Sequence, residues 1–184
     1  MNNENRKIIF LFPLLIYLIS ALVGCTSSQE RRILVVHSYE ETYTAYPEFN
    51  RLIAKQFKKE GVNADIRTLY LDCESYKEET ELKRMRYLER MRFLVDSVSK
   101  DWRPEVILVN EDQATYSLLK CGDPLVKEVP VVFAGVNYPN WELLKQYPNA
   151  TGFHDKIGFV QNAEMARKLF GDSVRLFTLL DSTF

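Results

Sequence analysis

The chain has few glycines and prolines, no repeated segment, and no excess of charge of one sign. Gly and Pro number seven each among 184 residues, while 46% of the residues are hydrophobic and 27% are charged. This composition excludes fibrous and intrinsically disordered proteins and indicates an ordinary globular chain. Lys plus Arg number 24 and Asp plus Glu number 25, for a formal net charge of -1. Nucleic-acid binding is disfavoured, because it usually requires a basic excess.

The common catalytic and nucleotide-binding motifs are also absent from the sequence. It contains no G-x-S-x-G elbow, no G-x-x-x-x-G-K-[ST] loop and no G-x-G-x-x-G fingerprint. The two histidines, His37 and His154, lack the H-x-x-x-H or C-x-x-C spacing that would support a metal site. We therefore expect no cofactor, no metal and no enzymatic activity in residues 1–184, with a kinase activity left open downstream of residue 184. A single-lobe hydrolase or flavodoxin-like enzyme is the least favoured alternative.

The first 24 residues have the order of a secretory signal peptide. Arg6 and Lys7 precede an apolar run at positions 8–23, which is slightly shorter than the ~20 residues of a membrane-spanning helix. The run ends in Leu22-Val23-Gly24-Cys25, which resembles a bacterial lipobox. We expect residues 1–24 to be removed, Cys25 to be lipidated, and residues 25–32 to form a polar tether on an exported, membrane-attached protein. The alternative is an uncleaved signal anchor.

The rest of the sequence alternates between apolar runs and helical patterns. Such alternation predicts a doubly wound α/β fold with a parallel sheet covered on both faces. The expected strands are 33–36, 64–71, 106–109, 131–134, 149–152 and 174–180. The expected helices are 47–59, 76–100, 113–120, 141–146 and 159–170. A last strand without a covering helix suggests that the fold continues beyond residue 184.

Polar and aromatic side chains gather where the expected strands end. In open parallel sheets, ligands bind beyond the carboxyl ends of the strands. Short polar side chains there could hydrogen-bond a small ligand, and tyrosines could pack on it. The residues are Ser38, Asn110, Asp112 and Asn137, with Tyr39, Tyr43 and Tyr46. Ser38 and Asp112 could instead be simple helix caps. Cys73 and Cys121 are expected at opposite edges of the sheet, as free thiols.

Four segments of the sequence, at the ends of the first four expected strands, carry a resemblance to a known family. They are Ile33-Leu34-Val35-Val36-His37-Ser38-Tyr39, Tyr70-Leu71-Asp72, Asn110-Glu111-Asp112-Gln113-Ala114 and Pro130-Val131-Val132-Phe133-Ala134-Gly135-Val136-Asn137. In this order they resemble parts of the extracytoplasmic sensor domains of bacterial two-component histidine kinases, including hybrid kinases. These domains are similar to ABC-transporter substrate-binding proteins. The resemblance extends through Asn149-Ala150-Thr151-Gly152 to about residue 181.

The resemblance implies a type I periplasmic-binding-protein fold with two lobes and a ligand in the cleft between them. Residues 33–152 would form the first lobe, and 153–184 the crossover and an incomplete start of the second. The implied function is a small-molecule sensor module of a membrane signalling protein, and the alternative is a solute-binding lipoprotein of an ABC importer. A homodimer is possible. The ligand-facing residues would be Ser38, Tyr39, Asp112, Gly135 and Asn137.

The sequence departs from that family at Glu40-Glu41-Thr42, where a more neutral loop is usual. Two carboxylates at the mouth of the site would favour a cationic or neutral ligand.

Substitution of Cys25 tests the lipid anchor. If the thiol carries the lipid, Cys25→Ala should block cleavage by the lipoprotein peptidase and abolish incorporation of labelled fatty acid. Processing is read as electrophoretic mobility in the same cells. Unchanged mobility together with undiminished label would contradict lipidation.

Overall fold

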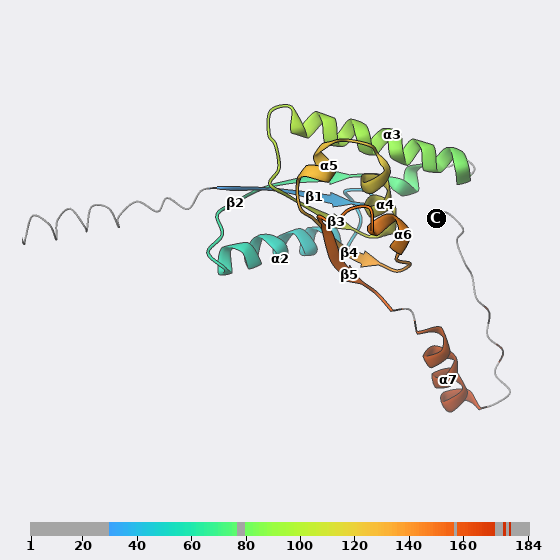
Figure 1. The fold of residues 1–184 in the computed structure, drawn as a ribbon. Coiled ribbons are helices and arrows are strands. Elements are labelled where there is room, and N and C mark those ends of the chain that lie inside the picture. The colour runs from blue at the N-terminus through green and yellow to red at the C-terminus, as the bar shows by residue number, and fades with distance from the viewer. Residues whose placement is uncertain (1–29, 77–79, 157, 172–174, 176, 178–184) are drawn as a thin grey trace, which may run out of the picture. The chain divides into compact units, whose positions relative to one another are not determined.

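Five parallel strands form a single sheet in the computed structural model (Figure 1). The structure describes residues 30–76, 80–156, 158–171, 175 and 177. The chain divides into Met1–Glu30 and Arg31–Phe184, and the sheet belongs to the second unit. The strand order is β2-β1-β3-β4-β5. The bounds are β1 Arg31–His37, β2 Ala64–Tyr70, β3 Val106–Asn110, β4 Val131–Val136 and β5 Ala150–His154.

Helices cover both faces of this sheet. The chain moves in one direction from β1 to β2 and in the opposite direction through β3, β4 and β5, so right-handed crossovers place α2 on one face and α3, α4, α5 and α6 on the other. The helices are α2 Tyr46–Lys59, α3 Thr80–Ser99, α4 Asp112–Lys120, α5 Leu125–Glu128, α6 Trp141–Leu144 and α7 Phe159–Phe170, with a short 3-10 turn, η1, at Cys73–Ser75.

The main hydrophobic core lies between the sheet and the α3–α4 layer. In β1, Leu34 and Val36 are completely buried, and Met91 and Val95 of α3 are equally inaccessible to solvent. Burying a side chain of this size contributes about 1.5–3 kcal/mol. The opposite face is covered less completely, because Leu108 of β3 and its neighbours in β4 remain partly exposed.

The structure confirms the expected doubly wound α/β fold. Helix α7 has the predicted bounds, and the fifth strand is present. Two details were wrong: the long helix begins at Thr80 rather than at residue 76, and the sequence analysis missed α5. The helix α5 has only four residues, too few for a periodic pattern. The predicted signal peptide, Cys25 and most of the predicted strand 174–180 lie outside the described residues, and the two-lobe division stays a prediction. None of the helices in the described ranges is long and apolar enough to cross a membrane.

The pairing of β4 with β5 depends on a glycine. Gly152 is opposite Phe133, and a Cβ added to Gly152 would lie 2.0 Å from the Phe133 carbonyl oxygen and 2.6 Å from its ring. Contact with backbone at that distance cannot be relieved by rotating a side chain. The two strands could no longer keep their spacing.

We therefore expect Gly152→Ala to lower the free energy of unfolding by at least about 2 kcal/mol, because overpacking displaces the backbone. Chemical denaturation provides the measurement. The neighbouring exposed position supplies the control, since Thr151→Ala should change stability by less than about 0.5 kcal/mol. Equal effects of the two substitutions would contradict the proposed close approach.

Candidate functional site

Two loops diverge from the centre of the sheet and leave the candidate site between them. The loop after β1 leads to α2 on one face, and the loop after β3 leads to α4 on the other. Ligands of doubly wound proteins bind where such neighbouring loops separate, at the carboxyl edge of the sheet. The residues predicted from the sequence all lie at this edge, and several are joined by hydrogen bonds.

Ser38 links the first strand to the third strand and to α4. Its hydroxyl donates to the Asn110 carbonyl oxygen at 3.0 Å and accepts from the Ala114 amide at 2.8 Å. The residue is completely buried. Ser38 therefore caps a helix, although the helix is α4 rather than the α2 that follows it in sequence. Direct contact with a ligand stays a prediction that this buried position does not favour.

Asp112 holds the loop that follows β4. Its carboxylate accepts hydrogen bonds from the Asn137 amide at 3.1 Å, from Asn137 Nδ2 at 3.2 Å and from the Tyr138 amide at 3.4 Å. Asp112 is only 8% exposed, whereas Asn137 is exposed. The pair thus lies together as predicted, but the aspartate is used inside the protein and only the asparagine is open to solvent.

Gly135 allows the end of β4 to pass close to the β3 loop. Its φ is +67°, in the left-handed region that favours glycine. A Cβ at this position would lie 3.3 Å from Asn110 Oδ1 and 3.4 Å from Glu111 Cγ. In the structure Gly135 therefore serves a close approach of the backbone, and its expected contact with a ligand stays a prediction.

Glu111 was missed as a site residue, although it directly precedes Asp112. Its backbone has φ 74° and ψ 169°, a region that non-glycine residues rarely enter and that costs on the order of 1–3 kcal/mol. The Tyr46 hydroxyl donates to its carboxylate at 3.1 Å and accepts from the Tyr39 amide at 3.0 Å. The two diverging loops are thereby joined across the edge. A charged residue immediately after a buried strand was the available sequence signal.

Burial raises the pKa of the Glu111 carboxyl to about 7, and the nearby Asp112 charge acts in the same direction, while the Tyr46 hydrogen bond opposes them. Burial also raises the pKa of Tyr39 to about 12, with a further contribution from the Glu111 charge. A carboxyl that changes charge near neutral pH at the mouth of a sheet is a common feature of functional sites.

Aromatic rings lie beneath this edge of the sheet, and one of them reaches the surface. The completely buried His37 stacks on Tyr46 with ring centroids 3.8 Å apart, and its Nε2 lies 2.9 Å from Asn50 Oδ1. Burial lowers the pKa of His37, so the ring is neutral at physiological pH. Tyr43 packs on Tyr39 at 4.8 Å and is 38% exposed. His37 is thus a core residue, while Tyr43 presents an aromatic surface to solvent.

In the described part of the chain, no three potential metal-ligating side chains come together. Cys73 and Cys121 are free and buried, and burial raises the pKa of both thiols. Neither has the exposure or lowered pKa of a reactive cysteine.

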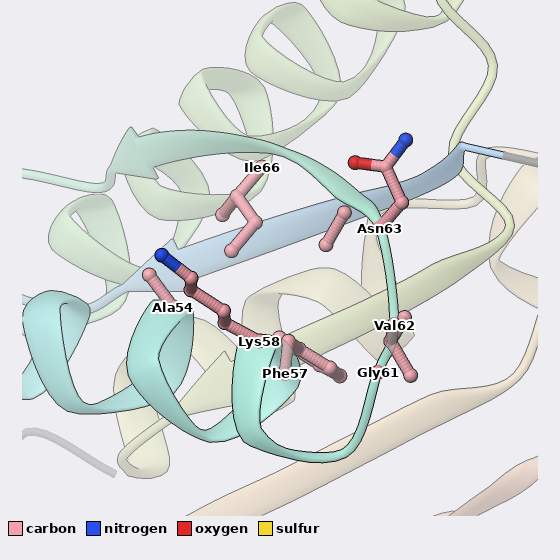
Figure 2. A pocket seen from close by; sticks show the side chains of 8 residues that line it. Ala54, Phe57, Lys58, Gly61, Val62, Asn63 and Ile66 are labelled. Carbon is pink, nitrogen blue, oxygen red and sulfur yellow. The ribbon is translucent and has the colours of Figure 1, made fainter. Parts of the chain in front are cut away.

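A separate hollow of about 420 Å³ lies at the opposite edge of the sheet (Figure 2). It is an open hollow lined by the end of α2 and the start of β2, with Phe57, Lys58 and Ile66 among its lining residues. It contains no residue predicted to bind a ligand.

No protein-family model and no curated protein matches the chain. Among solved structures, the chain is similar to a conserved domain protein from Vibrio cholerae O1 biovar El Tor strain N16961. The TM-score is 0.56 with 17% identical residues, and the match covers 77% of this chain and 44% of that one. The similarity supports the α/β fold, which is consistent with a Rossmann-like or periplasmic-binding-like lobe. The chain corresponds to less than half of the solved protein.

The raised pKa of Glu111 gives stability a defined pH dependence. The folded protein binds this proton more tightly than the unfolded chain, whose carboxyl titrates near 4.5. The contribution of Glu111 to the free energy of unfolding is therefore most favourable below pH 4.5, where the carboxyl is protonated in both states. This contribution is lost as the pH rises from about 4.5 to about 7. Between pH 5 and 8, the wild-type free energy of unfolding should fall by roughly 1–3 kcal/mol relative to Glu111→Gln.

Denaturation at a series of pH values measures this difference. Glu89→Gln is the control, because the Glu89 side chain is 63% exposed and its charge is well solvated. It should show no comparable pH-dependent difference. Parallel pH profiles for wild type and Glu111→Gln would contradict the raised pKa.

Proposed function

We propose that residues 31–154 form a ligand-binding lobe that holds a small molecule at the carboxyl edge of β1, β3 and β4. The observation that carries this proposal is the strained Glu111 backbone, which presents a half-buried carboxyl at the point where the two loops diverge. Strain of this kind persists where the surrounding structure requires it, and it is concentrated at functional sites. Two solvent-exposed side chains lie on the neighbours of this carboxyl and can contact a ligand: Tyr43 packs on Tyr46 with ring centroids 4.9 Å apart, and Asn137 hydrogen-bonds Asp112.

The charge of this edge favours a cationic or neutral ligand. Glu40, Glu74 and Glu111 each act on the Cys73 thiol and raise its pKa, in addition to burial, and Lys83 opposes them only partly. After burial, Glu111 and Glu74 also raise the pKa of Tyr39, so two of these carboxylates produce a negative field at the Tyr39 ring. An anionic ligand would enter against that field.

In the whole protein, the lobe would act as the extracytoplasmic ligand-binding part of a membrane signalling protein of the histidine-kinase type. This role rests on the secretory signal and on the four segments that resemble such sensors. Binding would change activity by favouring one conformation over another, which requires differential affinity but no bond chemistry. The lipobox-like Leu22-Val23-Gly24-Cys25 favours a second candidate, the solute-binding lipoprotein of an importer.

Thermal denaturation of the full chain with small probes of three charge classes tests the binding proposal. The probes are choline and tyramine, glucose and uridine, and acetate and citrate. We expect stabilisation by a cationic or neutral probe and none by the anions. Isothermal titration then gives the dissociation constant of the stabilising probe for wild type and variants.

Tyr43→Ala should raise the dissociation constant of that probe by roughly 3–10-fold, because an aromatic contact contributes about 0.5–1.5 kcal/mol. Phe93→Ala is the matched control, since Phe93 is an exposed aromatic residue of α3, 62% accessible to solvent. The probe should bind Phe93→Ala with the same dissociation constant as wild type. Binding that neither Tyr43→Ala nor Glu111→Gln weakens would place the ligand elsewhere and contradict the proposal.

A further inference from the structure

The strand β2 is at the end of the sheet, and one of its sides has no strand beside it. In the described part of the chain it pairs with β1 alone, from Arg31 opposite Ala64 to His37 opposite Tyr70. An unpaired edge presents backbone donors and acceptors that can pair with another chain. Natural proteins usually shorten, twist or charge such an edge.

The hydrogen bonds to β1 identify which backbone groups of β2 face outward. The Arg31 amide donates to the Asn63 carbonyl, and the Leu71 amide donates to the His37 carbonyl. In a parallel pair, alternate residues direct both backbone groups to the same neighbour. Odd-numbered residues of β2 therefore bond to β1. The outward groups belong to Ala64, Ile66, Thr68 and Tyr70.

The side chains of β2 carry opposite charges on one face. Asp65 accepts a hydrogen bond from Trp102 Nε1, and the Arg67 guanidinium carbon lies 4.6 Å from the centre of the Trp102 ring. Both charged side chains therefore point to the α3 side. Ile66 lies between them and points to the α2 side, into the hollow of Figure 2.

We propose that β2 pairs in antiparallel orientation with β2 of a second copy of this chain, about a twofold axis at Ile66. In a twofold pair the same surface meets itself, so the charges must complement each other. With Ile66 opposite Ile66 of the second copy, each Asp65 is directly opposite an Arg67. Opposite charges in such positions stabilise a strand pair, and like charges destabilise it.

Neighbouring registers do not satisfy this requirement. An axis at position 65 places the two aspartates opposite each other, and an axis at position 67 does the same with the two arginines. An axis at Ala64 or Thr68 leaves both charges without a charged residue opposite. The outward backbone groups of Ala64, Ile66 and Thr68 agree with the same choice, since they would pair as 64 with 68, 66 with 66 and 68 with 64. Charge thus selects one of these registers, and the hydrogen-bonding pattern is compatible with it.

The pairing also covers apolar surface. Residues directly opposite in an antiparallel pair have Cα atoms about 4.5–5.5 Å apart, so the two Ile66 side chains meet on the α2 face. The hollow of about 420 Å³ beside them is lined by Ala54, Phe57 and Val62 as well as Ile66. The resulting particle has one continuous ten-stranded sheet, and its two ligand edges remain open.

Charge exchange tests the proposal. Sedimentation of the full chain in mild detergent should show a dimer for wild type. The single variants Asp65→Arg and Arg67→Asp create like-charge pairs across the axis and should weaken the dimer by roughly tenfold or more. The double variant D65R/R67D restores opposite pairs and should restore wild-type association. A monomeric wild type, or a double variant as weak as the single variants, would overturn the proposal.

Two single cysteine substitutions determine which residues of β2 lie opposite each other in the dimer, without disturbing the contacts of Asp65 and Arg67 with Trp102. Ile66→Cys should form a reducible cross-linked dimer on mild oxidation of the full chain, because Cα atoms about 5.5 Å apart permit a disulfide. Thr68→Cys is the matched control, since its two copies would be four residues out of register and beyond disulfide reach. The unsubstituted chain supplies the background from native cysteines. Equal cross-linking of both variants, or of neither above that background, would overturn the register.

Discussion

The Ser38 hydroxyl is the contact on which the candidate site depends. It is buried, it accepts from the first turn of α4 and it donates to the end of β3, so that it fixes three elements at once. An unpaired buried amide costs about 1–3 kcal/mol, which gives the Ala114 amide a strong requirement for this partner. With that contact made, the residues between Asn110 and Ala114 have little freedom. Glu111 lies within this short span and takes an unfavourable backbone conformation there.

The Tyr46 hydroxyl provides the second connection between the diverging loops. It accepts a hydrogen bond from the Tyr39 amide in the loop after β1 and donates one to the Glu111 carboxylate in the loop after β3. Protonation of Glu111 removes its charge but leaves an acceptor for Tyr46, so the connection itself survives a change of pH. What changes is the field at the edge, because one of the carboxylates near Tyr39 loses its charge. Ligand charge and pH are thereby linked at the same group.

Much of the fold was predictable from the sequence, and much less of the site was. Apolar runs such as 33–36 and 131–134 identify buried strands because burial on both sides requires nearly continuous hydrophobicity. Helix α7 was also predicted with the observed bounds, although none of its residues is buried. The edge at which the polar residues gather follows from parallel topology alone. Their individual roles do not, because a serine in a βα loop can cap its own helix, cap a distant helix or contact a ligand.

Ser38 and Asp112 illustrate that limit. Both were predicted to face a ligand, and both are satisfied by groups at least two elements away: Ser38 by Asn110 and Ala114, and Asp112 by Asn137 and Tyr138. These partners are far apart in sequence and become neighbours only through the strand order. Glu111 could not be distinguished from Asp112 beside it, since its unusual property is a backbone angle imposed by tertiary contacts.

The arrangement of the sheet separates three roles that the proposals assign to one small lobe. The chain enters β1 at Arg31, on the amino edge, so a membrane tether before that residue connects at the edge opposite the ligand. The carboxyl edges of β1, β3 and β4 lie at the other end of the same strands. The free side of β2 is perpendicular to both directions, because strands pair sideways. A lobe of this kind could be tethered, paired and loaded with ligand at the same time, since none of the three contacts uses a residue that another requires.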